Sequence, residues 1–343
     1  MPLSKHRFIA SGDAVSQRLD HALFEWLLPL SPQPGFSRAK LRSLILAGSV
    51  YINGVRTLVP ARTLTAGARI EVFVDWKKIF ASAPASGVFS PSDLQVLFED
   101  EYLIAVLKPP GLPTQPTVDP TRDNLFQLLK KKLVAETGNP DAYVGLHHRL
   151  DRDTSGVVVF TKQTVANAGI AESFSRHLAQ KTYLAFTPLR TGQKVQNQWG
   201  VKNHLGKLPK RPGESKSAPS RYGEVRSGGD FAQTDFVLKQ RYEEGALWSC
   251  QPKTGRTHQI RVHLSESGMP IAGDDLYGVV GPRKSGSQKP APRLLLHALR
   301  LELNHPITGQ PLLIEAELPQ DFRSYLNQLR PLQPSSKGTS RQK

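Results

Sequence analysis

Hydrophobic and polar positions near the start of the chain follow a helical pattern and then a strand-like one. Residues 38–47 place apolar side chains on one helical face and two arginines, Arg38 and Arg42, on another. The Asn-Gly pair at 53–54 lies between apolar residues and predicts a hairpin, and residues 68–74 alternate like a strand. A small unit with a basic helical face is therefore expected, although an ordinary amphipathic helix with a solvated basic face explains the helix equally well.

The pattern that follows predicts a linker and then a larger domain. Residues 77–93 are rich in Ala, Ser, Pro and Gly, which is typical of a linker. Strand-like apolar runs come next, the first at 94–100 and 103–108, with only a few helices between later ones. This order favours an α+β fold with a mixed, largely antiparallel sheet and flanking helices. We therefore expect a small α/β unit at 16–76 and a main domain at 94–325.

Three polar segments interrupt or follow the main domain. Residues 202–226 and 281–293 combine basic side chains with prolines and glycines, and we predict that both are loops. Residues 331–343 are polar and basic, and a disordered tail is expected there.

Composition and charge indicate the kind of partner. The chain of 343 residues is 38% hydrophobic and 22% charged, which is typical of a globular protein. Its formal net charge is +16, and basic residues run from Lys5 to Lys343, so a basic tail alone does not explain the charge. A polyanionic partner is favoured, nucleic acid before an anionic membrane surface. With Cys250 as its single cysteine and no apolar stretch of membrane-span length or signal-peptide type, we expect a cytoplasmic protein.

The densest group of reactive side chains lies at 148–156, which reads His-Arg-Leu-Asp-Arg-Asp-Thr-Ser-Gly and precedes an apolar run at 157–160. A loop that feeds a buried strand would leave Asp151 at its end, where a substrate can reach it. A structural salt-bridge turn is the simpler interpretation of Asp-Arg-Asp-Thr alone. The same letters partly fit the nucleophile motif of aspartate-based phosphatases, in which Asp151 and Asp153 would form the pair. In those enzymes the hydrophobic strand comes before the motif, whereas here it comes after.

A second group follows a helix that we expect at about 164–180, with Phe174 and Leu178 facing inward. Residues 181–186 predict a strand in which Lys181 and Tyr183 share one face. A tyrosine there can stack on a base and transfer a proton through its hydroxyl, although a core tyrosine is the simpler interpretation.

The third group, 254–263, reads Thr-Gly-Arg-Thr-His-Gln-Ile-Arg-Val-His and fits either a short helix or a strand. As a helix, it places Arg261 on the same face as Thr257 and His258. The spacing of His258 and His263 matches no standard pair of metal ligands, and the segment has no carboxylate or cysteine partner, so we expect no metal.

Together these strings resemble the motifs of the pseudouridine synthases that modify ribosomal and transfer RNA. The segment 148–156 matches the catalytic motif of that family nearly residue for residue. The Lys-x-Tyr at 181–183 and the segment 254–263 are similar to its next two motifs. Residues 108–112 and 296–309 resemble its opening and closing segments, so the resemblance covers the whole main domain. Residues 16–76 resemble the S4 RNA-binding domain.

The resemblance implies roles for individual residues. Asp151 would be the catalytic residue, Tyr183 would line the active site beside it, and Arg261 would pair with Asp151. Arg256 is the second choice for that pairing. RNA contacts are expected from basic residues of the main domain and of the S4-like helix, namely Arg149, Lys181, Arg256, Arg38, Lys40 and Arg42.

The implied reaction is the isomerisation of uridine to pseudouridine in a pocket that accepts a flipped base. It is redox-neutral and transfers no phosphate, so no cofactor or metal is expected. RNA of the large ribosomal subunit is the first expected substrate and transfer RNA the second, with the protein acting as a monomer. The alternative is a non-catalytic RNA-binding or ribosome-assembly protein that keeps the basic first unit.

Overall fold

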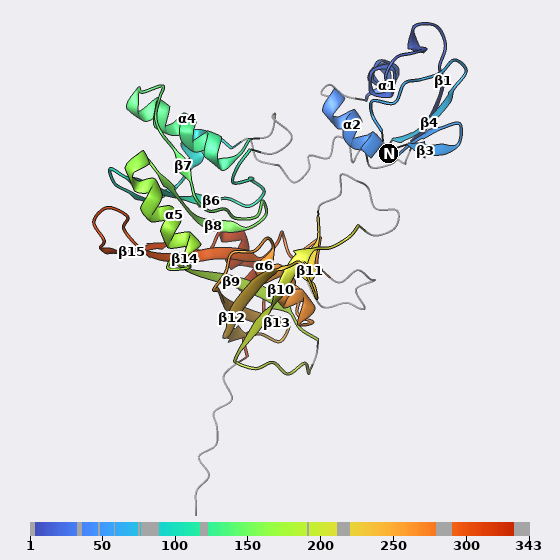
Figure 1. Ribbon diagram of the computed structural model, residues 1–343. Coiled ribbons are helices and arrows are strands. Elements are labelled where there is room, and N and C mark those ends of the chain that lie inside the picture. The colour runs from blue at the N-terminus through green and yellow to red at the C-terminus, as the bar shows by residue number, and fades with distance from the viewer. Residues whose placement is uncertain are drawn as a thin grey trace, which may run out of the picture. The chain divides into compact units, whose positions relative to one another are not determined.

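The computed structural model forms two compact units, residues 1–87 and residues 88–208 with 221–343 (Figure 1). Each unit has its own hydrophobic core, so each is described by itself. The residues that the structure describes are 4–32, 36–46, 49–57, 59–74, 76, 89–116, 123–190, 192–210, 220–278 and 290–332.

The first unit is an antiparallel sheet covered by two helices, with strand order β1-β4-β2-β3. Leu23, Ile45 and Ile70 are fully buried between the helices and the sheet. Two single 3₁₀ turns lie at Gly12–Ala14 and Leu28–Leu30. The strands are β1 (Ser4–Ile9), β2 (Val50–Ile52), β3 (Val55–Thr57) and β4 (Arg69–Val74), and the helices are α1 (Leu19–Leu27) and α2 (Arg38–Leu46).

Most of the pattern predicted for the first unit is confirmed. The helix at 38–47 is α2, and the expected hairpin joins β2 to β3 through Asn53 and Gly54, both with positive φ. Strand β1 lies before the expected start of the unit at residue 16, so that boundary is wrong. The strand is half-buried at the edge of the sheet. Phe8 is the only large apolar residue on its inward side, so the hydrophobic alternation that would predict a strand is weak.

The second unit is built on a sheet of eleven strands in the described part of the chain. Its main path is β11-β10-β12-β13-β9-β14-β8-β6-β5, while β15 pairs with β14 and β7 with β8. All pairs are antiparallel except β14 with β8, which confirms a mixed, largely antiparallel sheet. The strands are β5 (Val96–Glu99), β6 (Leu103–Lys108), β7 (Gly145–Leu146), β8 (Ser155–Thr161), β9 (Gln180–Pro188), β10 (Gln198–Lys207), β11 (Tyr222–Glu224), β12 (Asp230–Arg241), β13 (Gly245–Pro252), β14 (Leu296–Asn304) and β15 (Pro311–Glu315).

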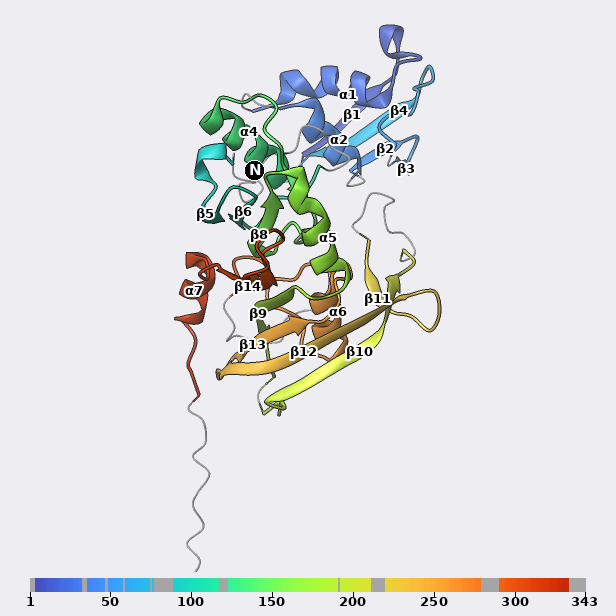
Figure 2. The same cartoon turned by 60° about the vertical axis from the view of Figure 1, so that its left-hand side comes forward.

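Helices cover this sheet at separate places (Figure 2). Helix α6 packs on β12 and β13, where the side chain of His263 reaches Thr234. Short 3₁₀ turns precede β5 and α5, at Pro91–Asp93 and Thr164–Ala166. The helices are α4 (Leu125–Thr137), α5 (Asn167–Ser175), α6 (Gln259–Glu266) and α7 (Gln320–Leu326).

The helix expected at 164–180 is shorter than predicted. It ends at Ser175, because His177 adopts a left-handed backbone with φ 58° and turns the chain toward β9. Leu178, expected to face inward, is 59% exposed. The turn thus brings the end of α5 next to the start of β9.

The loop predicted at 202–226 is wrong for most of its described residues. Strand β10 continues to Lys207 and pairs with β11. The lysine and histidine at 202 and 204 point outward, while alternate residues up to Leu205 are more buried, so basic residues concealed an alternating strand. Residues 211–219 lie outside the described chain, as do most of the predicted loop at 281–293 and the tail after 332.

Two residues of the predicted tail also take part in the fold. Pro331 forms an isolated bridge with Tyr242, and the Leu332 amide donates to the Arg241 carbonyl over 2.8 Å. The expectation of disorder from residue 331 is therefore wrong for the first two residues.

The 148–156 segment leads directly into strand β8, which lies between β14 and β6 in the sheet. Its seven residues are all buried, which confirms the strand predicted from the apolar run. Gly156 has φ 130°, and a Cβ atom there would overlap the Ala298 carbonyl oxygen of β14. Only glycine allows the parallel pairing of β8 and β14 at this point, and that pairing fixes the loop before β8.

Candidate active site

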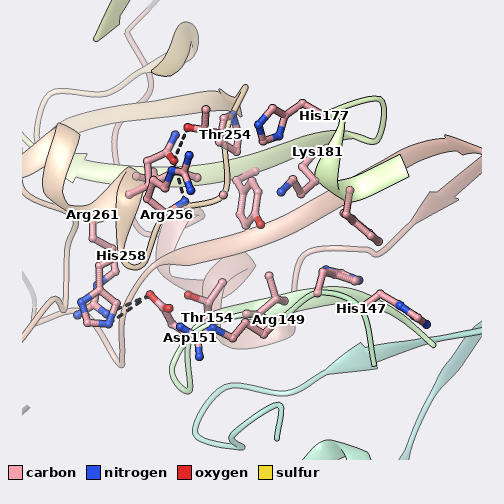
Figure 3. Close-up of a pocket in the computed structure, with 18 of the residues that line it drawn as sticks. His147, Arg149, Asp151, Thr154, His177, Lys181, Thr254, Arg256, His258 and Arg261 are labelled. Atoms are coloured by element: carbon pink, nitrogen blue, oxygen red, sulfur yellow. Dashed lines mark hydrogen bonds and ion pairs between the residues drawn. The ribbon is translucent and has the colours of Figure 1, made fainter. Parts of the chain in front are cut away.

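A pocket of about 670 Å³ opens in the second unit. The loop before β8, the start of β9 and the first turn of α6 form its walls. In Figure 3, Asp151, Thr154 and Arg149 lie along one wall and Lys181 and Thr254 lie across from them. The three groups of reactive side chains found in the sequence therefore meet in one place.

Asp151 lies in the pocket wall and is paired with Arg261. The Arg261 Nη1 donates to Asp151 Oδ2 over 3.2 Å, and the Asp151 side chain is 26% exposed. The remaining edge of the guanidinium donates to both carboxylate oxygens of Asp274, over 2.8 and 2.9 Å. Burial alone lowers the pKa of Arg261, but the bonds to Asp274 and Asp151 raise it above its ordinary value. Arg261 is thus a fixed cation with one edge directed at Asp151.

Asp274 is the fully buried anchor of this arrangement. Besides Arg261, it accepts the backbone N–H groups of Leu276 and Tyr277, each over 3.0 Å. Although burial raises the pKa of a carboxyl group, the hydrogen bonds from Arg261 hold the pKa of Asp274 below its ordinary value. Arg261 therefore compensates the charge of Asp274 through Nε and Nη2, and its Nη1 still donates to Asp151.

Lys108 holds the Asp151 loop by its backbone. Its ammonium group is fully buried and donates to three carbonyls, those of Pro109, Leu112 and Arg152, each over 2.8 Å. Burial lowers the pKa of Lys108 to about 7, while the three acceptors take all three protons of the charged form. The residue next to Asp151 is thus tied to the end of β6.

Tyr183 faces the pocket from β9. Burial raises the pKa of its hydroxyl well above the ordinary value, so the group stays protonated and can donate a hydrogen bond. Lys181, on the same strand face, lies with its ammonium 5.8 Å from the centre of the Phe174 ring. Burial lowers the pKa of Lys181 as well. The strand predicted at 181–186 is confirmed and both side chains line the pocket.

Arg149 and Arg256 also line the pocket, and each contacts a neighbouring segment. Arg149 donates to the Thr257 hydroxyl over 3.2 Å, and Arg256 Nε donates to the Phe231 carbonyl over 2.9 Å. Arg256 makes no contact with Asp151 among the described residues, so the geometry favours Arg261 over Arg256 as the partner of Asp151.

The other three predicted RNA-binding residues lie on α2 of the first unit. Arg42 donates to buried Asp20 over 3.1 Å, and Arg38 lies 3.7 Å from Glu25. The side chain of Lys40 is half-buried. The two arginine side chains remain 53% and 56% exposed, so they keep a solvent-facing surface despite their partners.

Several residues of the pocket and of its support were not found from the sequence. Asp274 and Tyr277 do not line the pocket but contact Arg261 and His258, which do. Asp274 belongs to a Gly-Asp pair that carried a usable signal, because an Asp in a turn commonly accepts the backbone N–H groups that follow it. Thr154 is buried in the pocket wall, and its hydroxyl has no hydrogen-bond partner among the described residues. His258 was considered only as a metal ligand, whereas its Nε2 lies 3.8 Å from Asp151 Oδ2.

The described residues contain neither a cluster of metal ligands nor a membrane-spanning helix. They contain no group of three or more His, Cys, Asp or Glu side chains placed to hold a metal ion. No helix in this part of the chain has the length and apolar character needed to cross a membrane.

Comparison with known proteins gives consistent matches. Residues 102–266 match the family model described as RNA pseudouridylate synthase. The chain is 32% identical over 324 residues to ribosomal large subunit pseudouridine synthase C of Pasteurella multocida, covering 93% of this chain and 92% of that protein. It is also 32% identical to ribosomal large subunit pseudouridine synthase D of Nitrosomonas europaea, covering 93% of this chain and 86% of that protein.

A solved structure matches the fold. Human RNA pseudouridylate synthase domain containing 4 superposes with a TM-score of 0.54 at 24% identity, covering 70% of this chain and 94% of that one. At this level of identity the match supports the architecture of the sheet and its helices.

Proposed function

This chain belongs to the RNA pseudouridine synthase family, and from that premise we propose that it isomerises uridine in RNA of the large ribosomal subunit, with Asp151 as its catalytic residue. The relatives that match over most of the chain are named for the large ribosomal subunit. The observation that carries the residue assignment is the ion pair of Asp151 with Arg261 in the pocket wall. Transfer RNA is the second candidate substrate.

Asp151 acts on the ribose or the uracil of a nucleotide that has left its stack and entered the pocket. It serves either as the nucleophile or as the general base. The reaction breaks the bond from the ribose C1′ to the uracil N1 and forms a bond from C1′ to C5, after which C5 loses one proton and N1 gains one. Arg261 stabilises the carboxylate of Asp151 with a charge-assisted hydrogen bond, and its pairing with Asp274 prevents it from swinging away.

Lys181 lies across the pocket from Asp151 (Figure 3), Tyr183 lines the same pocket, and both face the base in this proposal. The protonated Tyr183 hydroxyl can donate to a uracil oxygen, and its ring gives the base an aromatic surface. Because detached uracil must turn before it rejoins the ribose, a walled pocket that keeps it in place is needed.

RNA outside the pocket is bound by basic residues in both units. Arg149 and Arg256 line the pocket, and the exposed arginines of α2, Arg38 and Arg42, bind phosphates in the manner of an S4 domain, with Lys40 on another face of the same helix. Since phosphate contacts release counterions, affinity should fall steeply as salt is added.

The test is release of tritium from RNA labelled at uracil C5, measured for wild type and Asp151→Asn. Wild type should release tritium from ribosomal RNA and much less from transfer RNA. Asp151→Asn should release none. It should bind RNA with an affinity within about threefold of wild type, because replacing one carboxylate by an amide of the same size changes few of the contacts with RNA.

Asp153→Asn is the matched control, since Asp153 lies in the same loop but pairs with Arg152 and is 39% exposed. It should keep at least half of the activity. Equal release by wild type and Asp151→Asn would refute the catalytic role of Asp151. Tight RNA binding without release by wild type, on either RNA, would favour the alternative of a non-catalytic binding protein.

A further inference from the structure

The hydroxyl of Tyr277 lies between a backbone amide and a histidine ring. The Tyr222 N–H donates to the Tyr277 oxygen over 2.9 Å, and the same oxygen is 2.8 Å from His258 Nδ1. Among the described residues, Nδ1 is the only acceptor within hydrogen-bond distance of this hydroxyl, so we assign the hydroxyl as the donor to Nδ1. Burial raises the pKa of Tyr277 to about 12, so the hydroxyl keeps that proton at neutral pH.

This contact selects the tautomer of His258. With Nδ1 accepting from Tyr277, the ring proton resides on Nε2, and burial lowers the pKa of His258, which keeps the ring neutral. Nε2 lies 3.8 Å from Asp151 Oδ2, so its N–H faces the carboxylate (Figure 3). The backbone of His258 has φ 58° just before α6, which places the ring at the pocket rather than along the helix.

Two donors therefore face the same oxygen of Asp151. Arg261 Nη1 lies 3.2 Å and His258 Nε2 3.8 Å from Oδ2, whereas no side chain of the described residues is within hydrogen-bond distance of Oδ1. Asp274 aligns both donors, because it binds the guanidinium of Arg261 and the backbone N–H of Tyr277. One buried carboxylate thus sets the direction from which Asp151 is held.

We propose that Tyr277 and His258 are positioning residues: Tyr277 orients His258, and His258 and Arg261 together occupy Oδ2 of Asp151 and leave Oδ1 as the oxygen that reacts. At 3.8 Å the His258 contact is longer than a hydrogen bond, and it shortens when substrate fills the pocket, as catalytic contacts commonly do. This inference rests on the catalytic role proposed for Asp151, but its first test does not require activity.

The first test is the tautomer of His258 in the resting protein, read from the ¹⁵N chemical shifts of its ring by NMR. Wild type should show a neutral ring protonated at Nε2, with Nδ1 as an acceptor. In Tyr277→Phe the Nδ1 signal should move as its donor is lost. A ring protonated at Nδ1 in wild type would overturn the proposal, whatever the enzyme does with RNA.

The second test separates turnover from binding. Tyr277→Phe should lower kcat roughly 3- to 10-fold, the effect of one lost hydrogen bond, and leave KM for RNA within twofold. In a His258→Asn background, which tolerates the positive φ, Tyr277→Phe should cost less than twofold, because the hydroxyl acts through the imidazole.

Tyr143→Phe is the control, since among the described residues its hydroxyl accepts from Asn167 alone, and Tyr143 is not one of the residues that line the pocket. It should leave kcat unchanged. An unchanged kcat in Tyr277→Phe, or a loss confined to KM, would refute the positioning role. If wild type itself releases no tritium, the proposed function fails, while the tautomer measurement still decides whether Tyr277 orients His258.

Discussion

Each unit holds arginine on a buried aspartate, but the two pairs differ in how much of the arginine reaches solvent. In the first unit Asp20 is 3% exposed, while its partners Arg18 and Arg42 are 47% and 53% exposed. In the second unit Asp274 is fully buried and Arg261 is only 9% exposed. The same kind of ion pair therefore presents cations to solvent in the first unit and directs a single N–H group at Asp151 in the second.

The difference follows from what surrounds each carboxylate. Asp20 lies in α1, and the two arginines that donate to it stay about half exposed, as the proposed binding of phosphate requires. Asp274 lies in a turn that also supplies two backbone N–H groups, and it encloses Arg261 under Tyr277, whose ring centre is 5.1 Å from the guanidinium carbon. Burial of the cation, rather than the pairing itself, separates the proposed RNA-binding surface from the proposed support of the catalytic residue.

The largest expected effect is that of Asp274→Asn. The substitution removes one of the two carboxylates that are paired with the buried Arg261. This loss should destabilise the second unit by about 3 kcal/mol. Misplacement of Arg261 should lower kcat by roughly 100-fold. Urea denaturation and tritium release measure the two effects. Asp275→Asn is the control, because Asp275 is the exposed neighbour, and it should change neither the stability nor kcat. Full activity of Asp274→Asn would contradict the proposal that Asp274 supports catalysis through Arg261.

Asp20→Asn should have a smaller effect that depends on pH. Hydrogen bonds from Arg18, with those from Arg42, lower the pKa of Asp20 to about 2. A carboxyl whose pKa is lower in the folded state stabilises the fold above its unfolded pKa near 4, and this contribution is lost as pH falls toward 2. Asp20→Asn should therefore cost about 2 kcal/mol at pH 7 and about half as much at pH 3.

Denaturant unfolding of wild type and Asp20→Asn at pH 7, 5 and 3 measures this difference, with kcat as a second readout. The kcat should stay within twofold of wild type, because Asp20 belongs to the first unit. A stability difference that does not shrink on acidification would show that the charge of Asp20 contributes little.

The smallest effect is expected for Arg42→Gln. Removing one exposed cation should weaken RNA binding a few-fold and reduce the slope of log affinity against log salt by about one, with no change in kcat. Salt titrations of RNA binding measure the slope. Arg7→Gln is the control, because Arg7 is an exposed, ion-paired arginine on β1 rather than on α2. Equal slopes for wild type and Arg42→Gln would count against α2 as a phosphate-binding surface.

The elements that could be predicted from the sequence are those whose pattern has one interpretation. The seven buried residues of β8 and the Asn53-Gly54 hairpin are of this kind. Strand β10 was missed, because its exposed face carries Lys202 and His204 and its alternation looked like a basic loop. The segment that forms α6 fitted both a helix and a strand, and only packing on β12 and β13 decides between them.

The sequence predicted which residues form the candidate site better than it predicted the contacts between them. Asp151, Tyr183 and Arg261 came from the resemblance to a family, since nothing in local spacing links residues so far apart in the chain. Asp274 was missed, because its importance depends on a long-range pairing that no helical or strand period records. The resemblance implied the pairing of Arg261 with Asp151, but the pairing of Arg261 with Asp274 becomes visible only when the fold brings these residues together.

Strand β14 has a consequence for when the protein becomes functional. It lies between β8 and β9 in the sheet, and Leu296 at its start lines the pocket, yet it comes after Asp151, Tyr183 and Arg261 in the chain. At translation rates of roughly 5–20 residues per second, every proposed catalytic side chain leaves the ribosome before the strand that brings two of them together. The nascent polypeptide therefore carries its reactive groups in an unassembled form, and activity begins only after synthesis has passed β14.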